Sequence, residues 1–215
     1  IMLGGAAARA AEKLKAKIIA IATHQLQCDT ASIHYQGGHM LSADGRQISW
    51  DDIIELAHRQ IHGLPDGMDP GLASFDIMQV PTGGDLPKDG KVHMYPCYSF
   101  EFHLVLVAFD PIIGKPEIRS YTIGHDCGTV INPAIVSGMT YGGIAHGIGA
   151  ALLEEFAYDE SGQLMTQSFL DYLMPSSHEV PDIQLVKHCT PSPHTVFGQK
   201  GSGESGYLGA PAAIS

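Results

Sequence analysis

Apolar residues recur along the chain with two different periods, and the period predicts the type of each element. From Ala6 to Thr23 the sequence is rich in Ala, Lys, Leu and Ile, which predicts a helix. Three large apolar residues fall on one face of that helix: Leu14, Ile18 and Ile21. A second helix is predicted over Trp50–Ile61, because the spacing of Ser49 and Asp52 resembles a capping box.

Segments dense in β-branched and aromatic residues predict strands. They cover residues 32–41, 46–49, 72–80, 98–109, 117–123 and 183–189. An Asp-Gly pair at 44–45 and the segment Asp110–Gly114 predict hairpin turns between neighbouring strands. Residues 81–96 hold several prolines and glycines and are predicted to be irregular. Long loops inside compact domains are usually functional or disordered.

The segment that follows Ile131 has an unusual glycine content for a helix. Asn132 suits an N-cap and Pro133 suits the first turn, which predicts a helix over Pro133–Glu155. Glycines recur within it, at Gly138, Gly142, Gly143, Gly147 and Gly149. Each is unfavourable there by about 1 kcal/mol relative to Ala. Two explanations are open, namely tight packing against another backbone or the close approach of a ligand.

Helices and hairpins follow one another without a repeated strand–helix–strand pattern, which predicts an α+β fold. We expect a mixed or antiparallel sheet with helices packed against it. At 215 residues the chain is long enough for one or two domains and a sizeable core. Both ends lie within predicted helical segments, so we expect the chain to be part of a longer polypeptide.

The chain is acidic, with 12 Lys and Arg residues against 23 Asp and Glu residues and a formal net charge of −11. No basic block is present, which argues against nucleic acid as a partner. The sequence shows no signal peptide and no membrane-length apolar run, so we expect a cytoplasmic protein without a membrane partner. The cysteines are scattered and too sparse for a disulfide scaffold: Cys28, Cys97, Cys127 and Cys189.

Close to the C-terminus, the glycine-rich segment Gly198–Gly206 surrounds a single carboxylate, Glu204. The nearest neighbours of this carboxylate are small: Gly201, Ser202, Gly203 and Ser205. Glycines allow a backbone to approach a ligand closely, and the Ala-rich run behind the segment could begin a helix with unpaired N–H donors. Such a loop can hold an anion or a cofactor against one acid–base group. The alternative is an exposed surface turn.

Other types of site fit the residues poorly. Residues 201–206 match the glycine spacing of a dinucleotide-binding loop, but no clear strand precedes them and the expected later acidic residue is missing. The lysine of the segment precedes the glycines, which is the wrong order for a P-loop. The nucleophile motif of serine hydrolases is absent. His125 with Cys127, or His188 with Cys189, could ligate zinc, although neither pair has a known zinc-site spacing.

Several motifs taken in order resemble a known family. They include Asp-Cys-Gly-Thr-Val-Ile-Asn-Pro and Lys-Gly-Ser-Gly-Glu-Ser, and they cover residues 4–9, 126–133, 137–143, 154–159, 169–175, 190–194 and 200–205. Together they resemble the C-terminal part of the molybdopterin-binding large subunit of the xanthine dehydrogenase/aldehyde oxidase family. The closest similarity is to the carbon monoxide dehydrogenase-like large subunits. The resemblance is densest from Tyr98 onward.

The resemblance implies part of a larger molybdenum-cofactor-binding domain. Residues 1–96 would form the first part of the cofactor-binding region, and residues 97–215 the second part with the catalytic loop. Glu204 would be the catalytic acid–base residue, and no protein side chain would ligate the metal. Met139 stands where many relatives carry glutamine. The implied cofactor-binding residues are Lys200, Gly201, Ser202, Gly203, Asp126, Cys127, Gly128, Thr129, Asn132 and Met139.

The resemblance also implies a molybdenum hydroxylase. This oxidoreductase would add oxygen from water to an aldehyde, an N-heterocycle or a similar electrophilic carbon, while hydride passes to a Mo=S sulfur and the glutamate takes a proton. The cofactor would be molybdenum-molybdopterin, in the cytosine dinucleotide form that the bacterial resemblance suggests. The partners would be the remainder of the large subunit, a small subunit with [2Fe-2S] clusters and a medium subunit with FAD. We expect this chain alone to be inactive, and the alternative is a non-catalytic structural or assembly remnant.

Overall fold

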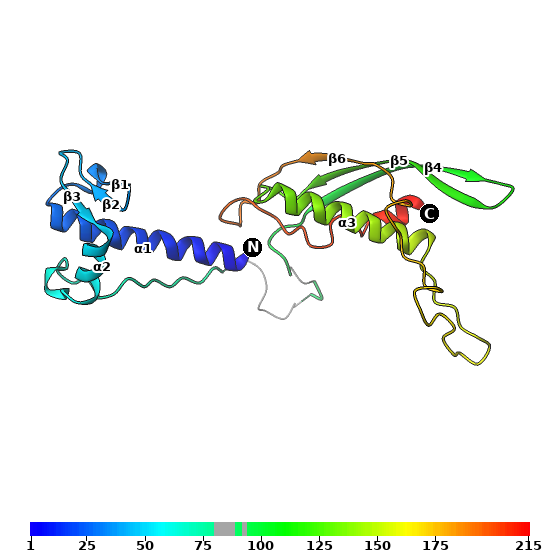
Figure 1. Ribbon diagram of the computed structural model, residues 1–215, viewed down its shortest axis with the longest axis horizontal. Helices are drawn as coiled ribbons and strands as arrows, with labels where there is room; N and C mark the ends of the chain where they lie inside the picture. Colours follow the sequence, from blue (N-terminus) through cyan, green and yellow to red (C-terminus); the bar gives the residue numbers. More distant parts are fainter. Residues whose placement is uncertain (80–88, 92–93) are drawn as a thin grey trace. The chain divides into compact units, whose positions relative to one another are not determined.

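A computed structural model describes residues 1–79, 89–91 and 94–215 (Figure 1). The chain divides into two compact units, which we call the N-terminal unit (Met2–Gln79) and the C-terminal unit (Val80–Ser215 with Ile1). Each unit contains helices and one small sheet, so the predicted α+β class is confirmed.

The N-terminal unit is built on one long helix. Its elements are α1 (Met2–Leu26), η1 (Thr30–Ser32), β1 (His34–Gln36), β2 (His39–Leu41), β3 (Gln47–Ser49), α2 (Trp50–His58) and η2 (Ile61–Gly63). The strands form an antiparallel sheet in the order β1-β2-β3. Buried apolar residues of α1, the sheet and α2 form one core, among them Ile21, Met40 and Ile53.

Local signals place the start of α2 correctly, although the helix ends at His58 instead of Ile61, and they place the first strands only in part. The Ser49 hydroxyl accepts the Asp52 N–H at 3.1 Å, and the Asp52 carboxylate accepts the Ser49 N–H at 3.3 Å, so the capping box is confirmed. The hairpin between β2 and β3 is confirmed as well. The prediction of one strand over residues 32–41 is wrong, because Gly37 and Gly38 have φ of 56° and 84° and reverse the chain between β1 and β2.

The strand predicted over residues 72–80 is wrong for its described part, and the irregular segment predicted over residues 81–96 lies largely outside the described residues. The backbone before Val80 is attached to α1 instead of to a sheet. Lys13 Nζ donates to the Phe75 carbonyl at 3.1 Å and forms an ion pair with Asp76 at 2.6 Å. Apolar composition suggested a strand here, but no strand among the residues that the structure describes pairs with this backbone.

The C-terminal unit is a sheet crossed by a long helix. Its elements are β4 (Phe100–Asp110), β5 (Lys115–Asp126), α3 (Pro133–Leu152), β6 (Ile183–His188) and α4 (Ala210–Ile214). The sheet order is β4-β5-β6, with β4 antiparallel to β5 and β5 parallel to β6. The mixed sheet is as predicted. The parallel pair makes β5–α3–β6 a strand–helix–strand crossover, which the sequence analysis missed because the long connection 153–182 separates α3 from β6.

Helix α3 lies along one face of this sheet, beside α4 (Figure 1). Its glycines divide into two groups. A Cβ atom at Gly143 would collide with the Ser205 carbonyl, one at Gly147 with Ala210, and one at Gly149 with the Glu154 carboxylate. The packing explanation is therefore correct for these three. A Cβ atom at Gly138 or Gly142 would meet nothing within 4 Å among the described residues, so packing explains neither glycine.

The two faces of the β4–β5–β6 sheet are covered differently. Residues that point towards α3 and α4 are buried, including Tyr121 and Ile123, and they join Ile144 and Ile148 in one apolar cluster. On the opposite face, large apolar side chains of β4 are 61% to 66% exposed: Phe100, Phe102, Leu104 and Leu106. Among the described residues of the C-terminal unit, no helix covers this outer face (Figure 1).

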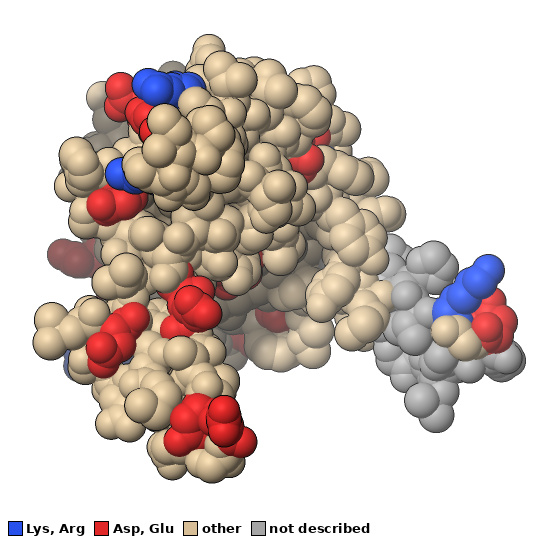
Figure 2. All heavy atoms as spheres, turned by 90° about the vertical axis from the view of Figure 1, so that its right-hand side faces the viewer, with Lys and Arg blue, Asp and Glu red and all other residues tan. Residues whose placement is uncertain are grey.

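Charged residues are dispersed over the surface that Figure 2 presents. The Lys and Arg residues drawn there lie beside Asp or Glu residues, with large areas of other residues between them. On that face the described residues therefore form no continuous basic surface.

Candidate functional site

The glycine-rich segment near the C-terminus lies against the end of β5. Lys200 N–H donates to the Cys127 carbonyl at 2.7 Å, and Thr129 N–H donates to the Gly198 carbonyl at 3.1 Å. Between these two bonds, Gly128 forms an isolated antiparallel bridge with Gln199. The structure thus brings together the two segments that the sequence motifs singled out separately.

A buried ion pair fastens these segments to each other. Lys200 Nζ lies 3.2 Å from the Asp126 carboxylate, and the two side chains are only 7% and 10% exposed. Asp126 also accepts the backbone N–H of Gly128 at 2.8 Å and of Thr190 at 3.1 Å. The Lys200 ammonium lies 5.3 Å from the centre of the Phe100 ring, which adds a cation–π contact. Both charged side chains are therefore committed to holding the loop.

The environment of Asp126 keeps its carboxylate ionised. Burial by itself would raise the pKa of Asp126, but the donors from Gly128, Thr190 and Lys200 outweigh it and hold the pKa well below its ordinary range. Burial raises the pKa of the neighbouring Cys127 thiol, which makes that thiol a poor nucleophile and metal ligand at neutral pH.

Glu204 lies on the exposed part of the loop. Its carboxylate makes no hydrogen bond or ion pair with the described residues. The loop closes behind it through two turns, in which Ser205 N–H donates to the Ser202 carbonyl at 3.4 Å and Tyr207 N–H donates to the Glu204 carbonyl at 3.2 Å. Among the described residues, no acceptor binds four successive backbone N–H groups, those of Gly201, Ser202, Gly203 and Glu204. The carboxylate and these donors are therefore free to meet a ligand.

Beneath the loop lies a network of buried polar side chains that the sequence analysis missed. Glu101 Oε1 accepts the Gly206 N–H at 2.8 Å, and Glu101 Oε2 lies 3.3 Å from His103 Nε2. His103 Nδ1 lies 2.7 Å from the Tyr121 hydroxyl. On the neighbouring strand, His125 Nε2 lies 2.9 Å from the Ser205 hydroxyl. These side chains come from β4 and β5, and they reach the backbone and one hydroxyl of the loop.

The pKa shifts in this network have distinct causes. Burial would raise the pKa of Glu101, but the hydrogen bonds from His103 and from the Gly206 N–H outweigh it and lower that pKa. Burial and then the charge of Glu101 raise the pKa of Tyr121 to about 12. Burial lowers the pKa of His125 despite the nearby carboxylates of Glu101 and Asp126, so its imidazole is neutral at pH 7. The carboxylate of Glu101 thus stays ionised at neutral pH, beside a neutral His125 and a protonated Tyr121 hydroxyl.

Ser205, His125 and Glu101 do not form a catalytic triad. The Ser205 hydroxyl lies 2.9 Å and Glu101 Oε1 lies 3.9 Å from the same imidazole nitrogen, His125 Nε2. In a triad the serine and the acid bind opposite nitrogens, so that the acid orients the ring while the other nitrogen takes the proton. Ser205 is also only 4% exposed. This geometry agrees with the absence of a serine-hydrolase motif.

One sequence signal could have located the network. In Phe100-Glu-Phe-His-Leu104, aromatic or aliphatic residues alternate with Glu101 and His103, and a strand presents alternate residues to opposite faces. We predicted only a strand there. The structure turns the polar set inwards and leaves the apolar set exposed, which reverses the usual pattern of a solvated sheet.

The remaining predicted cofactor residues lie on or before α3. Asn132 Oδ1 accepts the N–H groups of Ala134 at 3.1 Å and Ile135 at 3.2 Å, which confirms it as the N-cap of α3. Met139 lies about two turns beyond this N-cap and is 41% exposed, next to the open Gly138. No hydrogen bond between described residues joins either side chain to the Glu204 loop. Their proposed role in cofactor binding rests on the family resemblance.

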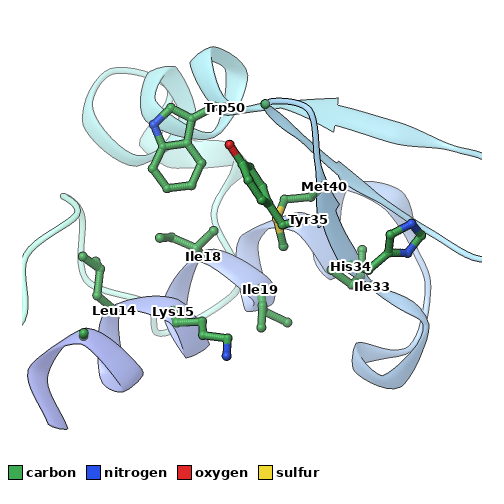
Figure 3. Close-up of a pocket in the computed structure, with 11 residues that line it drawn as sticks. Leu14, Lys15, Ile18, Ile19, Ile33, His34, Tyr35, Met40 and Trp50 are labelled. Carbon is green, nitrogen blue, oxygen red and sulfur yellow. The ribbon is translucent and has the colours of Figure 1, made fainter. Parts of the chain in front are cut away.

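The N-terminal unit contains an apolar groove of about 610 Å³ between α1 and the strands (Figure 3). Ile18 of α1 faces Tyr35 and Trp50, which pack edge to face with ring centres 6.4 Å apart. Among the described residues that line it, the ionisable side chains are Lys15, His34 and Tyr35. This described lining offers no carboxylate for acid–base chemistry, so the Glu204 loop is the candidate site.

Within residues 1–79, 89–91 and 94–215, no three His, Cys, Asp or Glu side chains converge in a way that could hold a metal ion. In the same part of the chain, none of the helices combines the length and apolar character that a membrane span needs.

Comparison with known proteins identifies the fold family. Residues 1–181 match the family model described as molybdopterin cofactor-binding domain. The chain belongs to this family. The match confirms the family that the ordered motifs indicated, and aligned relatives extend it through the Glu204 loop.

Individual relatives cover almost the whole chain. The nicotine 6-hydroxylase large subunit of Paenarthrobacter nicotinovorans is 33% identical over 216 residues, which cover 100% of this chain and 25% of the relative. The solved structure of a Cu,Mo-CO dehydrogenase matches with a TM-score of 0.76 and 27% identity over 99% of this chain and 25% of the other. Quinoline 2-oxidoreductase from Pseudomonas putida 86 matches with a TM-score of 0.72 and 33% identity over 96% and 25%, respectively. This molybdopterin-binding chain thus spans about a quarter of the length of these proteins.

Proposed function

We propose that this chain is the part of a molybdenum hydroxylase large subunit that supplies the acid–base group, Glu204. The observation that carries the proposal is an exposed, uncommitted carboxylate on a loop that is otherwise firmly anchored. Lys200 and Asp126 anchor the start of the loop at 3.2 Å, and the Gly206 N–H anchors its end on Glu101 at 2.8 Å. A catalytic carboxylate needs this combination of fixed backbone and free side chain.

The residues present fit an oxygen-rich cofactor. The free N–H groups of residues 201–204 are donors for phosphate, carbonyl or oxo groups, as in other glycine-rich anion sites. Two of these residues are glycines, and a Cβ atom at Gly203 would meet nothing within 4 Å among the described residues, so the loop leaves room on that side. Gly138 and Gly142 leave similar room along α3. We assign these groups, with Cys127, Gly128, Thr129, Asn132 and Met139, to the molybdopterin site.

The chemistry divides between cofactor and chain. When bound, the molybdenum cofactor supplies the two-electron redox step and the transfer of a water-derived oxygen. Glu204 accepts, at a carboxylate oxygen, the proton that the attacking oxygen gives up. The backbone donors of residues 201–203 orient the bound group beside that carboxylate. Asp126 and Lys200 hold the loop in place and stay outside the proton transfer.

The names of two relatives support a first choice of substrate class. The relatives that are 33% identical include proteins named for nicotine and for quinoline, both N-heterocycles. An electrophilic carbon of an N-heterocycle is therefore our first candidate, and an aldehyde is the second. By the same analogy the pterin carries a cytosine dinucleotide. The electrons leave through [2Fe-2S] clusters and FAD on partner subunits, and the rest of the large subunit completes the site.

The decisive experiment is Glu204→Gln in the assembled enzyme. We expect kcat to fall by about 100-fold or more, because general base catalysis contributes roughly 10²–10⁴. Molybdenum and pterin content should stay unchanged, since the amide preserves the size of the side chain. Glu160→Gln, at another exposed carboxylate, is the matched control and should retain normal turnover. Undiminished turnover of Glu204→Gln would remove the catalytic role and leave a structural or assembly role for the chain.

A further inference from the structure

The Glu204 loop is held from below by a side chain of a distant strand. Glu101 of β4 accepts the Gly206 N–H at 2.8 Å, although the two residues are far apart in sequence. The Glu101 side chain is 15% exposed. Burying an ionised carboxylate costs free energy of hydration, and its hydrogen bonds within the protein have to compensate for that loss. The bond to Gly206 is therefore part of what keeps this anion inside the unit.

The carboxylate itself has little freedom. Its second oxygen lies 3.3 Å from His103 Nε2, and His103 Nδ1 lies 2.7 Å from the Tyr121 hydroxyl. The His103 side chain is 5% exposed and the Tyr121 residue is 1% exposed, so both are almost fully buried. Because an ionised carboxylate only accepts hydrogen bonds, the geometry places a proton on His103 Nε2, which donates to Glu101, while Nδ1 lies against the Tyr121 hydroxyl. Each side chain in this hydrogen-bonded series thus fixes the position of the next one.

A second attachment lies one residue before Gly206. The Ser205 hydroxyl lies 2.9 Å from His125 Nε2 and 3.0 Å from the Ser202 hydroxyl. Gly206 has φ of 88°, and a Cβ atom there would collide with the Thr140 carbonyl of α3. The two residues after Glu204 are thus fixed by strands below and by a helix beside them. Glu204 is the last residue of the loop whose side chain remains free.

We infer that Glu101 is a positioning residue for Glu204. Through the Gly206 N–H it sets where the backbone of the loop ends, and so where the Glu204 carboxylate can reach. Glu101 does not touch the reacting atoms. The inference rests on the proposed function of Glu204, but its structural part concerns the loop alone. Displacement of a catalytic group by about 1 Å can cost roughly 100-fold in rate.

The test compares Glu101→Ala with Glu101→Gln in the assembled enzyme. Alanine removes the acceptor, and we expect kcat to fall by about 30- to 100-fold with KM changed by less than about threefold. Amide hydrogen exchange in peptides covering residues 201–207 should rise by about tenfold or more. Exchange in the hairpin turn at residues 110–114 should not change. Molybdenum content should stay within the wild-type range.

Glutamine should recover most of the loss. Its carbonyl can accept the Gly206 N–H, and its NH₂ can donate to His103 Nε2 if His103 adopts the other tautomer and donates to the Tyr121 oxygen. We expect kcat within about fivefold of wild type and normal exchange in the loop. If glutamine is as damaging as alanine, charge rather than position is the role of Glu101, and the inference is overturned.

Glu101→Asp covers the case in which Glu101→Ala does not assemble. It keeps the buried charge but shortens the side chain that accepts the Gly206 N–H, so it should lower kcat by roughly fivefold or more, with a matching rise in exchange at 201–207. Unchanged kcat and exchange in Glu101→Asp would overturn the inference. The exchange measurement also separates the two proposals. If Glu204→Gln is fully active while Glu101→Ala loosens the loop, the assigned function fails; if Glu204→Gln is inactive while Glu101→Ala changes nothing, the positioning role fails.

Discussion

The two units of this chain are stabilised by different kinds of core. The buried core of the N-terminal unit is apolar and includes Ile21, Ile53 and Leu26. The C-terminal unit buries a smaller apolar cluster and also these polar or charged residues: His125, Asp126, Thr140, Thr166, Ser192, Gln199 and Ser205. Among the described residues of the N-terminal unit, only Ser42 is a buried polar residue. Buried polar groups cost free energy unless each one finds a partner. The unit that carries the Glu204 loop bears most of this cost.

The difference shows how each core constrains its chain. Apolar contacts are non-directional, so the N-terminal core restrains its elements through close packing and not through fixed donor–acceptor directions. Hydrogen bonds such as the one from Gly206 to Glu101, at 2.8 Å, fix both distance and direction. A loop that must hold a reactive carboxylate in one place benefits from the second type of restraint. Departures from simple hydrophobic patterning are expected at functional sites for this reason.

The largest expected effect comes from breaking the buried ion pair. Lys200→Met leaves the Asp126 carboxylate buried without its cation, and removal of one member of a buried pair costs about 3–5 kcal/mol. We expect this loss in the local opening free energy of residues 126–129 and 198–200, measured by amide hydrogen exchange. The N-terminal unit should keep its wild-type exchange.

An exposed ion pair provides the control for that prediction. Arg119 lies 2.9 Å from Glu117, and both side chains are more than half exposed, at 57% and 59%. Arg119→Met should cost less than about 1 kcal/mol. Equal effects of Lys200→Met and Arg119→Met would show that burial of the Asp126–Lys200 pair is not what secures the loop.

A smaller effect is expected at the contact between α3 and the loop. In Gly143→Ala the new methyl group meets the Ser205 carbonyl, and overpacking of this kind costs about 1–3 kcal/mol. Gly142→Ala is the matched control. Its methyl group meets nothing within 4 Å among the described residues, and the substitution should stabilise α3 by up to about 1 kcal/mol.

Hydrogen exchange in α3 and at residues 201–207 measures both changes. The two adjacent substitutions should change the exchange rate in opposite directions. Exchange should be faster in Gly143→Ala and slower in Gly142→Ala. If Gly142→Ala also loosens the loop in the isolated chain, some contact other than the Ser205 carbonyl determines how α3 packs there.

The smallest expected effect is the response to mild acid. Burial lowers the pKa of His125 in the folded unit, whereas an unfolded histidine has a pKa of about 6.5. Between these values the unfolded chain binds more protons, so stability is full above pH 6.5 and falls as pH decreases. The fall is at most about 1.4 kcal/mol per pH unit for one group. Glu101 and Asp126 face this histidine and partly oppose the shift.

The two units should respond differently to this change in pH. From pH 7.5 to 5.5, opening free energies around residues 125 and 205 should decrease, after correction for the intrinsic pH dependence of amide exchange. His125→Gln should remove that decrease, because glutamine does not titrate. The apolar core around Ile53 should respond much less. An equal response of both units would mean that groups other than His125 control the pH dependence.

Local signals in the sequence were enough for several elements. The capping box at Ser49, the N-cap at Asn132 and the long β4–β5 hairpin all depend on residues close together in the chain, and the structure confirms them. The strand predicted over residues 72–80 is wrong for residues 72–79, since none of the strands in the described ranges pairs with them. The β5–α3–β6 crossover was missed because its strands are separated by a long irregular connection.

For the candidate site, as for the fold, the sequence predicted the local features and missed the distant contacts. Motifs identified Glu204, Lys200 and Asp126, because each lies in a short pattern with unusual composition. The contact between Lys200 and Asp126, and the support of Gly206 by Glu101, join positions that no local pattern connects. Only the alternation of polar and apolar residues in β4 hinted that Glu101 and His103 point inwards.

By itself, the sequence determined the helices, the main hairpin, the family and the position of the free carboxylate, because those depend on neighbouring residues or on short ordered motifs. Tertiary structure alone decided that β6 lies parallel to β5, that α3 needs glycine at Gly143, and that Glu101 and His125 support the loop. The physical reason is the directionality of these interactions. Hydrogen bonds and close backbone contacts depend on distances of a few tenths of an ångström between remote residues, and these distances exist only in the folded chain.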